Sequence, residues 1–307
     1  MQIHRGLNGI SKIKNAVVTT GTFDGVHIGH QVILRRLNIL AAEIDGESVL
    51  ITFWPHPRKV LYPETKGKNL KMIASQKEKI TLLQQTGLDH LVILEFTKEF
   101  SEMSSEKFIM EVFVKRLQAK RVIVGYNHYF GHNREGNFDF LRGIGKEYGF
   151  EVEEIPEQDI QNESVSSTKI RQALTDGNIQ KANAYLNNIY MISGTVKSCS
   201  QPFRQHSIQT FSLAIDEEDK LLPPTGIYAI SVEWDNNRKR GICFHIPASD
   251  GSLHLCFKLF DQTIPLVNQE VTVFFYKRIR GQEFFSDPLT DNKQLTKALS
   301  ETMELIY

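Results

Sequence analysis

The chain has 307 residues, of which 41% are hydrophobic, and this length favours two domains, each with its own core. Its 36 basic and 36 acidic residues cancel, which argues against a general attraction to nucleic acid or to a membrane surface and favours small-molecule partners. Three cysteines are too few for a disulfide framework, and no apolar run approaches a membrane span of ~20 residues, so we expect a cytoplasmic protein.

The N-terminal half alternates apolar runs with segments of helical periodicity. Helices are predicted from about residue 31, from 76 to 84 behind the capping-box pair Ser75 and Glu78, and over 108–117. The runs predicted as strands are 17–20, 48–53, 91–94 and 121–125. Continuous β-branched strands separated by helices indicate a parallel sheet covered on both faces. We therefore predict an α/β fold with a Rossmann-like, doubly wound domain that binds its ligand beyond the carboxyl ends of the strands.

The first strand runs into a glycine-rich loop and then a helix. Such a loop lets backbone N–H groups approach an anion, and the helix start adds its positive end. Two imidazoles three residues apart, His27 and His30, can donate hydrogen bonds to one phosphate chain. The other candidate phosphate-binding residues are Gly21, Thr22, Phe23, Asp24 and Gly29. Half of a metal site and an ordinary glycine turn are the alternatives; no second His or Cys pair at ligand spacing lies nearby, and no metal ligand is assigned.

Two further loops follow strands of the same predicted sheet. The prolines of the 54–57 segment fix the backbone around His56 at the rim, and a rigid turn with a solvated histidine is the alternative. Beyond the 121–125 strand, Asn127 offers a donor and an acceptor to a nucleobase, ribose or flavin edge. The aromatic rings of Tyr126 and Phe130, with that of Tyr129, offer surfaces for a planar ring, although packing is an equal alternative.

A cluster of hydroxyl groups precedes a later helix. Ser166, Ser167 and Thr168 supply an N-cap and a second positive helix end for a triphosphate. Arg171 lies three residues after Thr168, on the same helix face, where its guanidinium can neutralise a pyrophosphate leaving group. A plain cap with a surface arginine is the alternative.

The pattern changes near residue 188, so the predicted domains are 1–187 and 188–307. From there, short apolar runs are separated by Pro, Gly, Asp and Asn, which predicts a small antiparallel β-barrel. The polar run 216–220 is interpreted as a solvated turn, and a last helix is predicted over 292–306. The predicted strands are 191–196, 207–215, 226–234, 240–245, 253–259 and 270–276.

The motifs together resemble a known family. The run from Gly21 to His30, the 52–57 and 125–131 segments, and the run from Ser166 to Arg171 look like the FAD synthetase module of bacterial bifunctional riboflavin kinase/FAD synthetases, a branch of the HxGH nucleotidylyltransferases. The resemblance implies transfer of AMP from MgATP to FMN, giving FAD and pyrophosphate. It implies catalytic roles for His27, His30 and Arg171, and contact of His56 with the flavin phosphate.

The resemblance places a riboflavin kinase barrel in the C-terminal domain, but three of its functional positions differ. Counting back from the 220–223 segment puts Ser212 and Ala214 where the family has a Thr and an Asn that serve MgATP. The family's catalytic Glu, expected in the strand before the last, falls on Cys256. A thiol with a pKa near 8.5 is a poor substitute for a carboxylate base, and Ala214 has no group that can ligate a metal. We therefore expect an FAD synthetase whose kinase domain is inactive.

Other functions fit part of the pattern. A fully bifunctional kinase/synthetase, a nucleotidyl transfer to a nicotinamide or pantetheine phosphate, and a flavin- or nucleotide-sensing protein without turnover are the alternatives. The histidine loop opposes the sensor, and the 54–57 and 125–131 motifs oppose the other transfers. The expected ligands are ATP with Mg²⁺, FMN and FAD, and the sequence does not set the oligomeric state.

Overall fold

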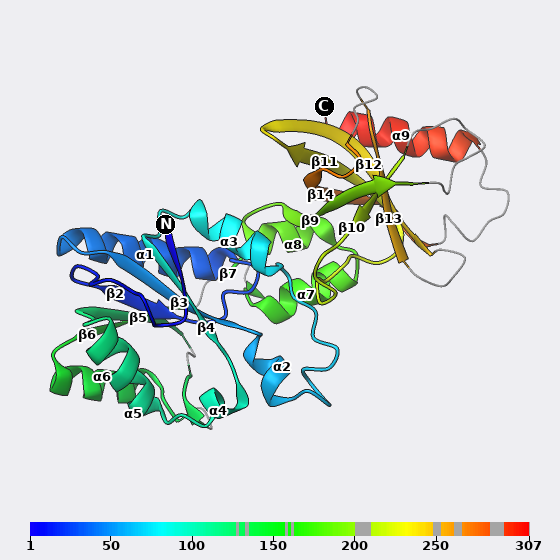
Figure 1. Cartoon of the computed structure of the whole chain (residues 1–307). Helices are drawn as coiled ribbons and strands as arrows, with labels where there is room; N and C mark the ends of the chain where they lie inside the picture. The colour runs from blue at the N-terminus through cyan, green and yellow to red at the C-terminus, as the bar shows by residue number, and fades with distance from the viewer. Residues whose placement is uncertain are drawn as a thin grey trace. The chain divides into compact units, whose positions relative to one another are not determined.

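The structure is a computed structural model that describes most of the chain (Figure 1). The described residues are 1–126, 129–132, 135–156, 159–160, 163–199, 210–247, 253–260, 266–282 and 292–306. They form two compact units, which we treat separately: unit 1 comprises Met1–Leu70 and Lys79–Val165, and unit 2 comprises Lys71–Glu78 and Ser166–Tyr307. No helix within the described ranges is long and apolar enough to cross a bilayer.

Unit 1 is built on a sheet of six parallel strands in the order β1-β4-β3-β2-β5-β6. The inner strands are the predicted apolar runs, and most of their residues are buried, as a parallel sheet covered on both faces requires. The edge strands lack such a run, and their sequences predict no strand. The strands are β1 (Gln2–Arg5), β2 (Val17–Thr20), β3 (Ser48–Trp54), β4 (His90–Glu95), β5 (Arg121–Gly125) and β6 (Glu151–Ile155).

Helices cover both faces of this sheet (Figure 1). On one face, helix α1 buries Leu34 and Leu37; on the other, Phe108, Val112 and Leu141 join the core of the sheet. The helices of the N-terminal half are α1 (Ile28–Glu43), α2 (Pro57–Leu61), α3 (Gln76–Gln84), α4 (Lys98–Ser101), α5 (Ser105–Phe108), the π-helix η1 (Ile109–Arg116) and α6 (Phe138–Tyr148). A two-stranded pair, β7 (Asp159–Ile160) and β8 (Glu163–Ser164), follows β6.

Two predicted helices differ in detail from those of the structure, and a third has the predicted cap. Helix α1 begins three residues before Gln31, with His27 as its N-cap. The helix predicted over 108–117 is present, but most of it has π-helical hydrogen bonding. The capping box is confirmed, because the Ser75 N–H donates to Glu78 Oε2 (2.8 Å) and the Glu78 N–H donates to Ser75 Oγ (3.2 Å).

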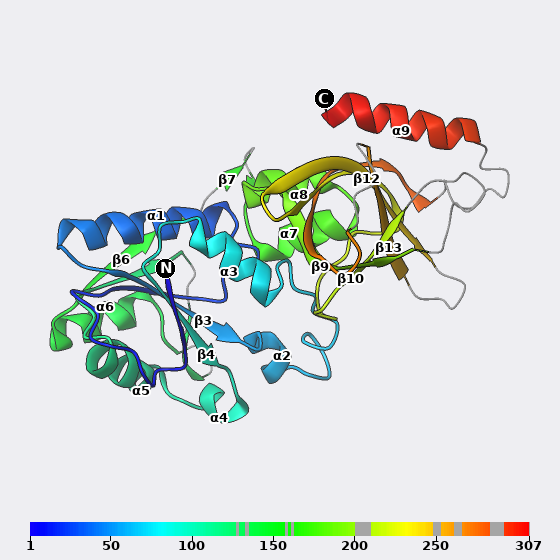
Figure 2. The ribbon, with the colours of Figure 1, turned by 45° about the horizontal axis from the view of Figure 1, so that its top comes forward.

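Unit 2 contains a closed barrel of six antiparallel strands in the order β10-β13-β12-β11-β14-β9. Helices α7 (Ser167–Thr175) and α8 (Ile179–Leu186) precede it, and α9 (Asn292–Ile306) lies against its outer surface (Figure 2), where Ala298 packs on Ile227 and Phe244. The predicted class, a Rossmann-like domain followed by a small antiparallel barrel, is therefore confirmed. The strands are β9 (Tyr190–Ser198), β10 (Phe211–Ala214), β11 (Gly226–Trp234), β12 (Asn237–Pro247), β13 (Leu253–Leu259) and β14 (Glu270–Arg280).

The interpretation of the 216–220 run as a solvated turn is wrong for Lys220. This residue is 3% exposed, and its Nζ donates to Glu78 Oε2 (2.6 Å) and to the carbonyl groups of Ile73 (2.6 Å) and Met191 (2.7 Å). Glu78 is also buried and accepts from the Ser193 N–H (2.7 Å). The ammonium group therefore has three acceptors for its three protons, which is what makes its burial possible.

Candidate active site

The candidate site of unit 1 lies where the strand order of the sheet reverses. From β2 the chain moves through β3 and β4 on one side, and β5 and β6 lie on the other side. The loop that begins at Gly21 leaves the carboxyl end of β2, and Tyr126 leaves the carboxyl end of the neighbouring β5. Ligands of open α/β sheets bind at such a switch point, so this edge of the sheet is where a nucleotide is expected.

The backbone of the loop after β2 is strained. Phe23 (φ 48°), Gly25 (φ 82°) and Val26 (φ 44°) all lie in the left-handed region. This conformation is costly for Phe and especially for the β-branched Val, whereas glycine tolerates it. The Gln31 side chain, one turn into α1, donates to the Val26 carbonyl (2.9 Å) and helps to hold the strained shape. Strain of this kind clusters at ligand-binding loops.

Helix α1 starts without a side-chain cap. Its N-cap is His27, whose side chain makes no capping hydrogen bond, and its first turn has no acidic residue. By contrast, α4, α6 and α7 are capped by Thr97, Asn137 and Ser166. The first N–H groups of an α-helix need acceptors from outside the helix. Together with the helix dipole, this leaves the start of α1 suited to a phosphate group.

The two histidines of the loop lie face to face. Their ring centroids are 3.6 Å apart with 20° between the planes, and Phe23 stacks on the other side of His30 at 4.4 Å. Gly29, which lies between them in the sequence, packs closely against the His27 ring, because a Cβ at this position would lie only 3.3 Å from that ring. The structure therefore brings His27, His30, Phe23 and Gly29 together, with both imidazoles at the start of α1.

The environment of His30 favours its neutral form. Burial, then His27 and then Lys79 hold the pKa of His30 well below its ordinary value of 6.5. Its Nδ1 atom is buried and has no hydrogen-bond partner among the described residues, and the same holds for the hydroxyl of Thr20 at the end of β2. Buried polar atoms of this kind are uncommon in native proteins, and a ligand that supplies partners is one explanation.

Lys79 is a charged residue of the site that the sequence pattern did not single out. It is 6% exposed, and its Nζ lies 3.3 Å from both the Thr22 carbonyl and the Thr52 hydroxyl. Thr52 itself donates to the Thr22 carbonyl (3.1 Å). A buried ammonium beneath a phosphate-type loop adds to its positive potential. The signal in the sequence is faint, because Lys79 stands on a helix rich in other charged and polar residues.

The candidate flavin-binding residues have different surroundings. His56 is the N-cap of α2, and its Nδ1 accepts from the Arg58 N–H (3.1 Å). Tyr126 is 54% exposed, whereas Phe130 packs on the unit 1 core, 6.3 Å from the Phe108 ring. Asn127 lies outside the described residues. Of the two aromatic candidates, Tyr126 is the exposed one and Phe130 is used in packing.

The candidate residues 166–171 belong to unit 2. Ser166 caps α7, with its Oγ accepting from the Lys169 N–H (3.3 Å), and Ser167 is the first residue of the helix. Thr168 is exposed. Arg171 donates through Nε to the Lys71 carbonyl (2.9 Å), so part of its guanidinium is used to hold the 71–78 segment. Whether these residues meet the histidine loop stays a prediction.

The three barrel positions that the resemblance predicts to be altered, Ser212, Ala214 and Cys256, share one face. Ser212 of β10 stands directly opposite Cys256 of β13, and Ala214 follows two residues later on the same strand. Opposed residues and residues two apart share a face of a sheet. Phe211 and Leu213 are buried while Ser212 and Ala214 are partly exposed, so this is the outer face of the barrel.

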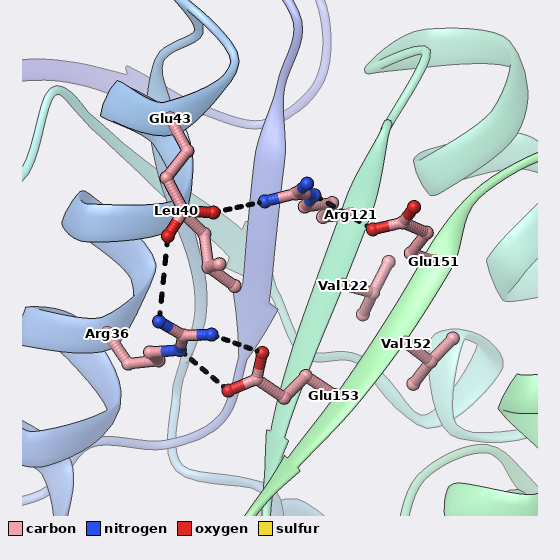
Figure 3. Close-up of a pocket in the computed structure, with 8 residues that line it drawn as sticks. All are labelled: Arg36, Leu40, Glu43, Arg121, Val122, Glu151, Val152 and Glu153. Carbon is pink, nitrogen blue, oxygen red and sulfur yellow. Dashed lines mark hydrogen bonds and ion pairs between the residues drawn. The ribbon is translucent and has the colours of Figure 1, made fainter.

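A pocket of about 290 Å³ lies at the opposite edge of the parallel sheet (Figure 3). Arg36 forms two hydrogen bonds to Glu153 (2.7 and 2.9 Å), and Arg121 pairs with Glu43 (2.8 Å) and Glu151 (2.9 Å). Its hydrogen bond to Arg36 lowers the pKa of Glu153. These ion pairs lie at the amino ends of β5 and β6, and because Arg36 and Glu43 belong to α1, they fasten that helix to the sheet.

Comparison with known proteins matches both units to families. Residues 10–169 match the FAD synthetase family, and residues 186–306 match the riboflavin kinase family. The bifunctional riboflavin kinase/FMN adenylyltransferase of Buchnera aphidicola subsp. Schizaphis graminum is 32% identical and covers 100% of this chain and 98% of its own length. The protein of that name from Pseudomonas fluorescens is 31% identical, covering 93% of this chain and 92% of its own length.

A solved structure has the same fold along the whole chain. It is described as a macrolide-efflux protein from Streptococcus pneumoniae, with a TM-score of 0.87, 24% identity, and coverage of 99% of this chain and 98% of its own. At that identity the likeness concerns the fold alone.

The fold and these matches place the chain among transferases of FAD biosynthesis that bind nucleotides. More closely, it belongs to the bifunctional riboflavin kinase/FMN adenylyltransferase family, with both the FAD synthetase and the riboflavin kinase domains present.

Proposed function

We propose that this chain is an FMN adenylyltransferase that uses MgATP to convert FMN to FAD and pyrophosphate, and that its barrel does not phosphorylate riboflavin. The observation that carries the first part is the stacked His27 and His30 pair at the uncapped start of α1, at the switch point of the sheet. We also propose 1–187 and 188–307 as the functional domains; the matched ranges 10–169 and 186–306 support this division.

The reaction needs no nucleophile from the protein. An oxygen of the FMN phosphate attacks the α-phosphorus of ATP in line, forming the new P–O bond while the bond to the β-phosphate bridging oxygen breaks and pyrophosphate leaves. Catalysis of this kind comes from positioning and from neutralising charge. Gly21, Thr22, Phe23 and Asp24 in the loop, with Gly29 in the first turn of α1, would cradle the phosphates through their backbone.

The histidines supply donors to the phosphate chain. His30 is neutral before ATP binds, because burial disfavours its charged form, and a neutral imidazole still donates one hydrogen bond. A bound triphosphate raises the pKa of a nearby imidazole through its negative charge, so ATP favours the protonated form that neutralises it. Charge that develops at the α-phosphate in the transition state is then met by donors already in place.

The remaining candidate residues would contact the β- and γ-phosphates of ATP or the FMN molecule. Ser166, Ser167, Thr168 and Arg171 would serve the β- and γ-phosphates, with Arg171 neutralising the leaving group. For the flavin, we propose His56 at the FMN phosphate and Tyr126 against the ring. Asn127, at a nucleobase or flavin edge, and Phe130 complete the proposed set.

Mg²⁺ would come with ATP. The described residues contain no group of three or more His, Cys, Asp or Glu side chains arranged to hold a metal. Mg²⁺ is usually bound with nucleotides through phosphate oxygens and water, with few protein ligands. The ion would offset phosphate charge, and this chain's own residues would bind and orient the two phosphates.

The outer face of the barrel supports the second part of the proposal. Cys256 stands where the family resemblance puts the carboxylate base, opposite Ser212, and Ala214 stands where it puts an Asn. The Cys256 thiol has its pKa raised, first by its hydrogen bond to Cys199 and then by burial, so it does not ionise readily. A kinase needs both a base for the ribityl hydroxyl and a platform for MgATP.

One experiment separates this proposal from its alternatives. The purified protein is incubated with FMN plus MgATP and, separately, with riboflavin plus MgATP, and the flavins are identified by chromatography. We expect FAD from the first mixture and unchanged riboflavin from the second. FMN and FAD from the second would show a fully bifunctional enzyme, and tight flavin binding with no product from either would show a sensor.

Restoring one kinase position is expected not to restore kinase activity. Cys256→Glu returns a carboxylate, but Ala214 still offers neither a ligand nor a donor to MgATP, so FMN formation from riboflavin should stay at background. The measurement is FMN appearance by fluorescence-detected chromatography, with a family member of known kinase activity as the positive control. Robust FMN formation by the unmodified chain would contradict the inactive barrel.

Lys79→Met is expected to lower kcat/KM for FAD formation about tenfold, which corresponds to ~1.4 kcal/mol of lost transition-state stabilisation. Lys79 places a positive charge beside the loop and holds the Thr22 carbonyl, and Met keeps the length of the side chain without the charge. Steady-state kinetics with varied ATP measure the change. Lys77→Met is the matched control on the same helix, because Lys77 pairs at the surface with Glu270; equal rates in both variants would remove Lys79 from the site.

Arg171→Ala is expected to weaken use of ATP, and Thr168→Ala to do so less. Arg171 has the charge to neutralise pyrophosphate, whereas Thr168 offers a single hydroxyl. Kinetics and the melting temperature are measured on both variants, because Arg171 also bonds to the Lys71 carbonyl. A large fall in Tm accompanying the loss of activity would assign Arg171 a structural role.

A further inference from the structure

Two of the three cysteine side chains of the chain meet in the barrel. The Sγ atoms of Cys199 and Cys256 are 3.0 Å apart, and no disulfide bond joins them in the structure. A disulfide bond is ~2.05 Å long, so the two sulfur atoms are within about 1 Å of bonding distance. Neither residue has a role in the adenylyl transfer proposed above.

The barrel topology explains why they meet. Cys199 directly follows the end of β9, and Cys256 lies on β13, with β10 hydrogen-bonded between the two strands. Ser212 of β10 is opposite Lys197 on one side and opposite Cys256 on the other. The two cysteines therefore lie on either side of β10, near its first residues, where their side chains can contact each other.

Cys243 does not share this arrangement, although it lies on the neighbouring strand β12. Its opposite residue on β13 is Phe257, while Cys256 is opposite Phe244. Successive residues of a strand point to opposite faces, so Cys243 and Cys256 lie on different faces of the barrel. Cys243 is fully buried, and burial raises the pKa of its thiol.

The two paired cysteines differ in access. Cys256 is 1% exposed, whereas Cys199 is partly exposed. The hydrogen bond to Cys199 and burial raise the pKa of Cys256, which keeps it as a thiol. Reactivity toward an oxidant depends on thiolate character and on access, so Cys199 is the residue that an external reagent reaches first.

We propose that Cys199 and Cys256 form a reversible disulfide site on the outer face of the barrel, oxidised by low-molecular-weight disulfides and reduced by thiols. This inference does not depend on the function proposed above, because it rests on the contact between the two sulfur atoms and on the strand register.

The exchange balances in two steps. The Cys199 thiolate attacks one sulfur of the external disulfide, its S–S bond breaks, and one small thiolate leaves and takes up a proton. Cys256, losing its proton to water, then attacks the Cys199 sulfur of the mixed disulfide and expels the second small thiolate. Two protein thiols are oxidised and one external disulfide is reduced to two thiols.

The test uses the full chain in its native state. It is equilibrated with excess oxidised glutathione, the remaining thiols are alkylated, and the peptides are mapped by mass spectrometry. We expect a Cys199–Cys256 cross-link that dithiothreitol reverses, with the reactive thiols of the denatured protein falling from three to one. Cys243→Ser is the matched control and should keep the cross-link, whereas Cys199→Ser should lose it.

Three outcomes would overturn the proposal. One is an unmodified chain in which both thiols remain alkylatable after equilibration. A second is a chain that carries glutathione on Cys199 with no cross-link to Cys256. Circular dichroism of the oxidised protein shows whether the cross-link formed in folded protein, and a cross-link found only after unfolding would also count against it.

Discussion

Replacing His30 with alanine is expected to lower kcat for FAD formation by about 100-fold to 1,000-fold, with much smaller changes in the affinities for ATP and FMN. The ring of His30 stacks between His27 and Phe23 and stands at the start of α1, where phosphate is expected. Charge at the transferring phosphorus grows in the transition state, so a donor aimed there contributes to turnover more than to ground-state binding.

Single-turnover kinetics and equilibrium binding of a non-hydrolysable ATP analogue separate these effects. His27→Ala should behave in the same way, and His30→Gln, which keeps an N–H donor, should lose less than His30→Ala. His254→Ala, an exposed histidine of the barrel, is the control. Loss of affinity with unchanged turnover would show that the histidines hold only the ground state.

The titration of His30 also makes the stability of the unmodified protein depend on pH. Because the folded-state pKa of His30 is below its ordinary value of 6.5, the unfolded chain binds more protons between these two values. The contribution of the neutral ring to stability is therefore fully present above pH 6.5 and is lost as the pH falls toward the folded-state pKa. His30→Ala should lack this part of the acid destabilisation.

Much of the fold could be predicted because its signals are local. The buried strands are continuous apolar runs, and the bounds of β11, β13 and α9 agree with their sequence patterns. The edge strands β1 and β6 gave no such signal. Each is only partly buried, and β6 reads Glu-Val-Glu-Glu-Ile, so neither shows the unbroken β-branched run of an inner strand.

Some residues of the candidate site could likewise be predicted from the sequence, and others could not. The glycines and histidines from Gly21 to His30 could be predicted because they are close in the sequence and their spacing has a chemical meaning. Lys79 could not, since nothing in the helix pattern indicates that its ammonium reaches Thr22, 57 positions away. Contacts between segments that are distant in the chain produce no periodic pattern in the sequence.

Lys220 is the clearest example of such a contact, and its replacement is expected to have the largest effect on stability. Its partner Glu78 is 142 positions away, and their side chains are each 1% exposed. The Lys220 ammonium also lies 4.5 Å from the centre of the Tyr190 ring. A polar run in sequence is usually solvated, so this burial could be found only from the fold.

Lys220→Met should destabilise unit 2 by about 3–5 kcal/mol, because it leaves the Glu78 carboxylate buried without its cation. For a unit of this size the melting temperature should fall by roughly 10 °C, measured by calorimetry of the full chain. Lys77→Met, which removes the exposed pair with Glu270, should change stability by less than about 1 kcal/mol.

A double variant tests the cause. Adding Glu78→Gln to Lys220→Met removes the unpaired charge, so the double variant should be more stable than Lys220→Met alone. If the two substitutions instead add their separate losses, the buried charge is not the source of the effect. The destabilisation would then come from lost packing of the Lys220 stem against Tyr190 and its neighbours.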